Sequence, residues 1–412
     1  MPTKRGWAAF GSGLALWLAA RYTGSRDLHM IAAGVLTLPF LAALFVQWNR
    51  VRLDIRRTLS SVRVFPGAKV TATLTIENGG PGSAPFLLME DFVPGELGEP
   101  ARLVVTGIPA RDRQVVSYAF VCRRRGRFTV GPTSIVITDP FGLARVKISS
   151  DTVNDLIVYP EVEDVDLRGL AVQGAGSGDS AVRHLYRSAA EFYTMREYVT
   201  GDDLRRIHWP SVARTGHLMI RQDETTRRSV ATIFLDNRAA ALGSSGTAGF
   251  ERGVSIAATA ARSLIRAGFA VRLATVDAPA QMVNEERLLE RLADVGHTRE
   301  KSMADALRAI GSAVVNDSTL VLVTTPPHGA EVVGISRAGS GFGRKVVVLI
   351  YPVKLGTLPP EAAAEIEGRA SVARASLQRA GWQVFVIEPD GRLADAWRKS
   401  RPKKVRAAVS SF

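Results

Sequence analysis

The chain has a single cysteine and comparatively few acidic residues. Cys122 is alone in 412 residues, which excludes an intramolecular disulfide and a zinc site built from several cysteines. Asp and Glu number 39 against 53 Lys and Arg, so the net charge is +14 and the pI is about 10.4. This excess suits an anionic surface such as lipid headgroups, nucleic acid or an acidic protein. Because the basic residues are spread along the whole chain, we expect no nucleic acid as a partner.

The sequence also lacks the short motifs of several enzyme classes. It contains no G-x-x-x-x-G-K-[ST], no H-E-x-x-H and no G-x-S-x-G. A His–Asp–Ser set can be written from His208, Asp202 and Ser211, and the adjacent carboxylates of Asp202 and Asp203 could act as acid and base. The arginines nearby favour ion pairing instead. We therefore expect no enzymatic activity, and the alternative is a membrane-bound hydrolase centred on Asp202, Asp203 and His208.

Two apolar runs lie near the N-terminus. Residues 30–48 carry no charge and approach the length of about 20 residues that crosses a bilayer, with Pro39 as a kink. Residues 6–20 are apolar but short, so a signal peptide competes with a transmembrane helical hairpin, which we favour. Arginines follow the second run closely. The positive-inside rule therefore predicts a multi-pass protein of the cell (inner) membrane with both soluble domains in the cytoplasm.

From residue 51 to about residue 160 the sequence alternates with a period of two. Val70, Ala72, Leu74 and Ile76 alternate with threonines, which predicts a half-buried strand. Further strands are predicted at residues 87–92, 101–106, 113–121, 126–130, 134–138 and 156–159. Turn residues separate them at the intervals of a small antiparallel β-sandwich.

From residue 230 strands alternate with helices. Strands are predicted at residues 230–236, 271–276, 320–325, 346–351 and 383–387. Helices are predicted at residues 253–267, 285–295, 302–314 and 361–380. This alternation predicts an α/β doubly wound parallel sheet.

Residues 191–221, here called the signature stretch, combine many charges with aromatic residues. The carboxylates of Glu197, Asp202 and Asp203 are expected to pair with arginines, with Trp209 and other aromatic rings shielding them from water. Such a polar knot would serve either as a partner-binding surface or as a structural element. Its candidate residues are Arg196, Glu197, Tyr198, Gly201, Asp202, Asp203, Arg205, Arg206, Trp209 and Arg214.

The pattern R-E-Y-x-x-G-D-D-x-R-R-I-x-W-x-x-x-A-R-T-G in this stretch resembles the signature of the domain-of-unknown-function 58 family of bacterial membrane-associated proteins. His208 stands where that family more often has Asp, and Pro210 where it more often has Lys. A D-P-F-G-L turn at residues 139–143 is similar to one in the same family. The resemblance implies a MoxR-type AAA+ ATPase as a partner, with a transglutaminase-like membrane protein as a further partner.

Asp236 follows the first strand of the α/β region, where ligands bind in such sheets. This arrangement resembles the von Willebrand factor A fold, whose metal site has D-x-S-x-S at that position. Here the sequence is D-N-R-A-A, so both serines are absent and Arg238 adds a positive charge. Because Mg²⁺ prefers oxygen ligands, we expect a metal-free recognition domain and no cofactor, with Mg²⁺ at Asp236 as the alternative.

The sequence therefore predicts a membrane-anchored, non-enzymatic adaptor that works with a MoxR-type ATPase in protein assembly or cell-envelope maintenance. An anionic-lipid or nucleic-acid binder is a further alternative. The expected parts are a transmembrane hairpin (1–50), a β-sandwich (51–160), the charged signature segment (161–228), a von Willebrand A-like domain (229–390) and a disordered basic tail (391–412).

Overall fold

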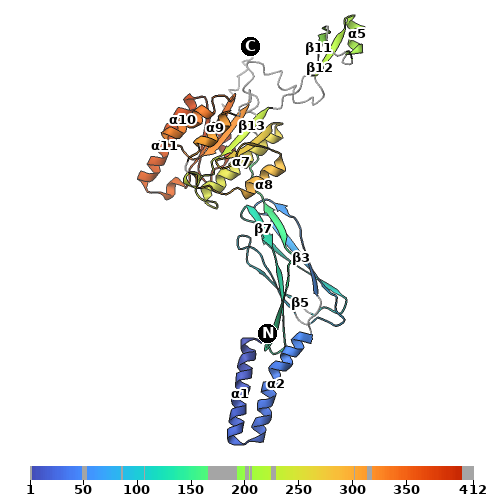
Figure 1. Cartoon of the computed structure of the whole chain (residues 1–412). Coiled ribbons are helices and arrows are strands. Elements are labelled where there is room, and N and C mark those ends of the chain that lie inside the picture. Colours follow the sequence, from blue (N-terminus) through green and yellow to red (C-terminus); the bar gives the residue numbers. More distant parts are fainter. Residues whose placement is uncertain are drawn as a thin grey trace, which may run out of the picture. The chain divides into compact units, whose positions relative to one another are not determined.

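A computed structural model describes residues 2–48, 53–84, 87–105, 107–165, 193–199, 204, 207–223, 229–300, 302–312 and 318–400. The chain divides into two compact units. One comprises Met1–Glu161 with Leu289–Asp294, and the other comprises Val162–Leu288 with Val295–Phe412. Their elements are labelled in Figure 1.

The first unit begins with two packed antiparallel helices, α1 (Lys4–Thr23) and α2 (Arg26–Trp48). Gly24 ends α1 with a φ of 67°, a left-handed conformation that glycine adopts without steric cost. Along the pair, Gly13 lies against Leu36, and the rings of Phe10 and Phe40 meet edge to face with centroids 6.3 Å apart. Small residues at the contact allow the two backbones to approach closely.

Only one described helix, α2, is long and apolar enough to cross a membrane, over Arg26–Gln47. The sequence predicts two such spans, but α1 is not apolar enough to count as a second one. Lys4, Arg5 and Arg21 lie within α1 and lower its hydropathy. A signal sequence near the N-terminus passes the same test as α2, so the structure supports one candidate membrane helix and no multi-pass location.

The strands that follow, β1 to β10, form the β domain. Their bounds are β1 (Leu53–Leu59), β2 (Arg63–Val64), β3 (Lys69–Asn78), β4 (Leu87–Asp91), β5 (Ala101–Val105), β6 (Arg113–Val121), β7 (Gly126–Val130), β8 (Thr133–Thr138), β9 (Arg145–Ser150) and β10 (Asn154–Val158). They pair in three sheets, ordered β1-β3-β6, β2-β10-β7 and β5-β4-β8-β9. Every predicted strand is present. The pairing is antiparallel, as expected, except between β2 and β10, which are parallel. A period of two carries no information on strand direction, so the sequence could not reveal this difference.

Two apolar clusters form the core of the β domain. In the first, Ile55 and Leu74 pack with Leu87 and Ile137, joining the sheet of β3 to the sheet of β4. The second joins β3 and β6 to β7 and β10, and it contains Cys122. The inward positions are those that the alternation of β3 predicts, since its buried residues recur at every second position.

The buried thiol of Cys122 should be unreactive in the folded protein. Burial raises the pKa of Cys122 to about 11, so little thiolate forms at pH 8, and the thiolate is the reactive species. We expect Ellman's reagent to label no cysteine in native buffer and one per chain in guanidinium chloride. Complete labelling within minutes in native buffer would contradict this burial.

The helical pair is held to the D-P-F-G-L turn between β8 and β9. The Thr3 backbone N–H donates to the Leu143 carbonyl at 2.8 Å, and the Thr3 hydroxyl donates to the Gly142 carbonyl at 2.6 Å. Leu143 is also buried with Val46 near the end of α2. The start of α1 and the end of α2 therefore contact the same turn.

The second unit contains the α/β domain, a six-stranded sheet in the order β15-β14-β13-β16-β17-β18. The strands are β13 (Val230–Leu235), β14 (Ala270–Thr275), β15 (Gln281–Val283), β16 (Thr319–Thr324), β17 (Arg344–Ile350) and β18 (Gln383–Ile387). All neighbours are parallel except the edge strand β15, which runs antiparallel to β14. The helices are α6 (Ala239–Leu242), α7 (Ala248–Arg266), α8 (Glu285–Asp294), α9 (Ala304–Ser312), α10 (Gly329–Ala338), α11 (Pro360–Arg379) and α12 (Leu393–Ser400), with a 3₁₀ turn η2 (Leu355–Thr357).

Helices cover both faces of this sheet. On one face, Phe234 and Leu322 pack with residues of α9, α10 and α11. On the other, Gly253 of α7 lies close to the side chains of Leu235 and Ile350. Successive residues of β13 are buried on opposite faces, which explains the continuous apolar run that predicted this strand.

The expectation of a disordered tail from residue 391 is wrong for its first part. Residues 393–400 form α12, in which Leu393 and Trp397 are buried and the Trp397 ring lies 5.4 Å from that of Phe385. Leu393 and Trp397 are four residues apart and share one helix face, so burial stabilises a helix that its many charges obscure in the sequence. The basic residues from Arg401 onward lie outside the described residues.

Candidate functional site

The signature stretch forms a small hairpin with an inserted helix, here called the signature module. Strand β11 (Tyr193–Glu197) pairs antiparallel with β12 (Met219–Asp223), and helix α5 (Trp209–Thr215) lies between them in the chain. A bridge joins Ile207 to Ile220. Gly216 ends α5 with a φ of 71°, which turns the chain back toward β12.

The structure places five of the ten candidate residues of this stretch. Arg196 and Glu197 end β11, Tyr198 follows directly, and Trp209 and Arg214 lie on α5. The other five, Gly201, Asp202, Asp203, Arg205 and Arg206, lie outside the described residues.

The side chain of Trp209 is 66% exposed, so the ring itself is not buried, and the carboxylates of Asp202 and Asp203 that it was expected to shield lie outside the described residues. Helix α5 has seven residues and buries none of them, so it provides no core in which the indole could pack. Val199, Leu204 and Leu218 of the same module are also largely exposed. The described part of the module therefore has exposed apolar side chains, a tryptophan among them, and the polar knot stays a prediction.

His208 and Ser211 contact each other at the start of α5. The His208 Nδ1 lies 2.9 Å from the Ser211 Oγ, and the Ser211 backbone N–H donates to the His208 carbonyl, also at 2.9 Å. His208 is the N-cap residue of the helix and Ser211 is three residues further on, but the His208 side chain makes no capping hydrogen bond to the backbone, and the contact joins two side chains. Asp202, the third member of the proposed set, lies outside the described residues.

Asp236 lies where sequence analysis places it, directly after β13, and it is fully buried. Strand β13 is flanked by β14 and β16, so the strand order reverses beside it. Ligands bind at this place in many α/β sheets. Here the Thr324 hydroxyl, at the end of β16, donates to Asp236 Oδ2 at 2.6 Å.

The side chain of Arg238 occupies the position beside Asp236. Its Nε and Nη2 donate to the two Asp236 carboxylate oxygens, each at 2.8 Å, and its Nη1 donates to Glu331 Oε1 of α10 at 2.7 Å. Burial lowers the pKa of Arg238, but the hydrogen bonds and charges of Asp236 and Glu331 raise it overall. The guanidinium is therefore a fixed internal cation.

These residues do not fit Mg²⁺. Both carboxylate oxygens of Asp236 accept hydrogen bonds from a cation already present, and Mg²⁺ would need further oxygen ligands in a near-octahedral array. In the part of the chain that the structure describes, no group of three or more His, Cys, Asp or Glu side chains could hold a metal ion.

Comparison with protein families supports one assignment. Residues 194–324 match the family model described as "Protein of unknown function DUF58". The DUF58 match runs from the signature module through the end of β16, and it therefore contains Trp209, Asp236 and Arg238. The match leaves the helical pair, the β domain and helices α10 and α11 outside. No curated protein matches the chain.

Solved structures resemble only parts of the chain. The CARDB domain of a Pyrococcus furiosus protein, in complex with di-metal ions, is 10% identical with a TM-score of 0.20, over 26% of this chain and 93% of that one. An alkylpurine DNA glycosylase from Pseudomonas fluorescens is 12% identical with a TM-score of 0.18, over 32% and 39%. A β-glucosidase from Listeria innocua is 11% identical with a TM-score of 0.16, over 24% and 16%. At these scores the likenesses carry no argument about fold or function.

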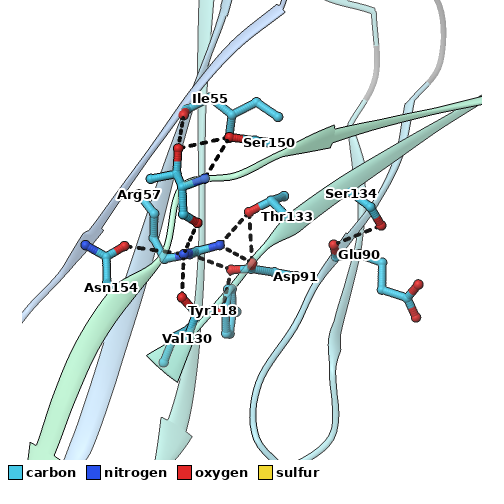
Figure 2. Close-up of polar contacts among 11 residues, drawn as sticks. Ile55, Arg57, Glu90, Asp91, Tyr118, Val130, Thr133, Ser134, Ser150 and Asn154 are labelled. Atoms are coloured by element: carbon cyan, nitrogen blue, oxygen red, sulfur yellow. Dashed lines mark hydrogen bonds and ion pairs between the residues drawn. The ribbon is translucent and has the colours of Figure 1, made fainter. Parts of the chain in front are cut away.

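A second buried ion pair lies in the β domain, outside the DUF58 match (Figure 2). Arg57 of β1 and Asp91 of β4 are both fully buried, and the guanidinium donates to both carboxylate oxygens. Asp91 also accepts from the Tyr118 hydroxyl at 2.6 Å and from the Thr133 hydroxyl at 2.8 Å. Burial, and then the hydrogen bond to Asp91, raise the pKa of Tyr118.

The remaining donors of Arg57 are also satisfied. Its Nη2 donates to the Thr133 hydroxyl at 2.6 Å, and its Nη1 donates to Asn154 Oδ1 at 3.3 Å. The same Nη1 also donates to the carbonyls of Val130 and Thr152, at 2.8 and 2.9 Å. This network joins strands of all three sheets and leaves no group directed at a ligand, so its role is structural. Sequence analysis missed it, although the alternation of β1 places Arg57 on the same inward side as Ile55.

Proposed function

We propose that this protein is a membrane-anchored, non-enzymatic adaptor that works with a MoxR-type AAA+ ATPase in protein assembly or cell-envelope maintenance. The observation that carries the proposal is the exposure of Trp209 within a module of the DUF58 match. Tryptophan is enriched among the residues that dominate protein–protein binding energy, and a large exposed aromatic ring is suited to that role.

The anchoring part of the proposal rests on the helical pair. Helix α1 packs antiparallel along α2, and the start of α1 and the end of α2 contact the same turn. If α2 crosses a membrane, α1 would therefore lie in the membrane beside it, and the protein would be a two-pass protein of the inner membrane. Arg56 and Arg63 follow α2 closely, and the positive-inside rule then puts both soluble domains in the cytoplasm, where an AAA+ ATPase is found.

The recognition part rests on the α/β domain and the signature module. Helices cover both faces of the parallel sheet, as a von Willebrand A-like domain requires, and Arg238 replaces the cation of a metal site. Recognition by such a domain would not depend on Mg²⁺. A transglutaminase-like membrane protein is a further expected partner, and nucleic acid is not.

Replacing Trp209 by alanine should reduce recovery of the ATPase about tenfold, because one central aromatic residue can dominate an interface. The measurement is an affinity pull-down from gently solubilised native membranes, with and without ATP. Phe92→Ala is the matched control, since Phe92 is an exposed aromatic residue of the β domain. Equal recovery of the ATPase by the wild type and by Trp209→Ala would show that Trp209 is not part of the interface.

Asp202→Arg, checked for folding, tests the rest of the signature module in the same pull-down. Loss of the ATPase with this variant would place the charged residues at the interface, whereas unchanged recovery would make them structural or remote from it. Recovery of no ATPase by the wild type, from membranes shown to contain one, would overturn the adaptor proposal.

The contact between His208 and Ser211 favours one second candidate, a membrane-bound hydrolase. Ser211→Ala would abolish hydrolysis if Ser211 were a nucleophile, and it would leave partner recovery unchanged if the contact only orders the start of α5. Because Asp202, which would complete the set, lies outside the described residues, we place the adaptor first.

A further inference from the structure

A groove of about 710 Å³ runs between α10 and α11 on one face of the α/β domain. The two helices lie side by side against the sheet, as Figure 1 shows. The groove is lined from α10 by residues that include Val332 and Val333, and from α11 by residues that include Arg369, Val372 and Arg379.

The groove has an apolar floor and open, apolar rims. Val332 and Ala373 form its base and belong to the buried core of the domain. Val333 and Val372 line it at the surface, with exposures of 54% and 68%. A Cβ added at Gly368 would meet no atom within 4 Å, so the rim at that point is open.

The charged groups of the groove are cationic. Arg369 and Arg379 lie ten positions apart on α11, and no carboxylate is among the lining residues. Arg369 Nη1 lies 3.3 Å from the His328 Nε2, and the buried Arg369 Nε has no hydrogen-bond partner among the described residues. Within the described part of the chain, Arg379 donates to Ala375 and Ser376 of its own helix, at 3.3 and 3.4 Å. Since a guanidinium has five N–H donors, both arginines retain donors for a further acceptor.

We infer that this groove binds an amphipathic helix of a partner protein that carries acidic residues beside its apolar face. Ten positions along α11 correspond to roughly 15 Å, so the two arginines would meet carboxylates about three helical turns apart. Apolar residues at i, i+3 and i+4 spacing on the partner would pack between them, as in other helix-in-groove complexes.

Charge selects the occupant. The chain itself has a net charge of +14, so a second copy is a poor electrostatic match for a cationic groove. Its C-terminal residues from Arg398 onward are also strongly basic, and the same repulsion disfavours them as an internal occupant. The inference rests on the proposed adaptor role for its biological meaning, since an adaptor needs a second docking surface for a client.

The test uses the full chain in detergent and a fluorescent model peptide of about 15 residues, long enough for four helical turns. The peptide carries leucines at helical spacing on one face and glutamates on both flanks. Fluorescence anisotropy compares it with a scrambled peptide of the same composition and with a version in which lysines replace the glutamates. We expect the acidic helix to bind at least about tenfold more tightly than either control.

Variants locate the binding in the groove. Val372→Glu should weaken binding of the acidic peptide about tenfold or more, and Arg369→Glu with Arg379→Glu should shift the preference to the lysine peptide. The matched controls are Val353→Glu and Arg398→Glu, which change an exposed valine and an exposed arginine outside the groove. Both controls should bind as the wild type does.

Equal binding of the three peptides, or binding that ignores the groove variants, would overturn the inference. Complete competition by inorganic phosphate with no preference for the amphipathic order would show an anion site only, which also overturns it. If the ATPase is recovered but the peptide does not bind, the adaptor role stands and the groove is not a binding site. If the peptide binds but no ATPase is recovered, the groove is a binding site and the adaptor role fails.

Discussion

Replacement of Arg57 by methionine should lower the free energy of unfolding of the β domain by about 3–5 kcal/mol, because it leaves a buried carboxylate without its cation. Asp91 is fully buried and would keep only the hydroxyl donors of Tyr118 and Thr133. The Val130 and Thr152 carbonyls would also lose the guanidinium N–H groups that they accept from. Three sheets would thus be affected by one side chain.

The chain offers a specific probe for this measurement. Cys122 is its one cysteine and is buried in the β domain, so pulsed thiol labelling along a denaturant series reports unfolding of that domain alone. Arg102→Met is the matched control, since Arg102 and its partner Glu90 are exposed and such pairs contribute about 1 kcal/mol or less.

A second variant separates the charge from the packing. Arg57→Met combined with Asp91→Leu removes both charges and should recover part of the lost free energy of unfolding, because no buried charge is then left unpaired. If Arg57→Met alone costs no more than the Arg102→Met control, the buried network does not stabilise the β domain as we infer.

Replacement of Arg238 by methionine should destabilise the α/β domain by a similar amount, about 3–5 kcal/mol. Asp236 is fully buried, and Arg238 supplies donors to both of its oxygens. The same substitution would release Glu331 of α10 from its contact with Arg238. Since Asp236 lies between β13 and β16, the loss should affect the centre of the sheet rather than an edge.

Tryptophan fluorescence reports this second effect. Trp382 and Trp397 are buried in the α/β domain, whereas the β domain between residues 53 and 161 contains no tryptophan. Arg262→Met is the control, because Arg262 pairs with Glu285 nearer the surface and should cost about 1 kcal/mol or less. A midpoint for Arg238→Met equal to that of Arg262→Met would mean that Asp236 needs no internal cation.

Much of the secondary structure could be predicted because it depends on local patterns. The alternation around Leu74 reports burial of one face of β3, and the apolar run around Ile233 reports burial of both faces of β13. The prediction missed strands β1, β2, β9 and β15 and helices α6, α10 and α12. The three residues of β15 are too few to show a period, and the two glycines of α10 lower its helix propensity. The assignment of the α/β domain as von Willebrand A-like, the ATPase partner and the membrane topology remain predictions.

The sequence alone determined the alternation of strands and helices in the α/β domain, the signature stretch around Trp209, the excess of positive charge and the position of Asp236 after a strand. Only the tertiary structure decided which charges neutralise one another. Asp91 is 34 residues from Arg57, and Glu331 is 93 residues from Arg238. It also decided that α10 and α11 leave a cationic groove between them. Local spacing specifies how a segment folds, but contacts across dozens of residues depend on how strands and helices pack, and no single segment encodes that packing.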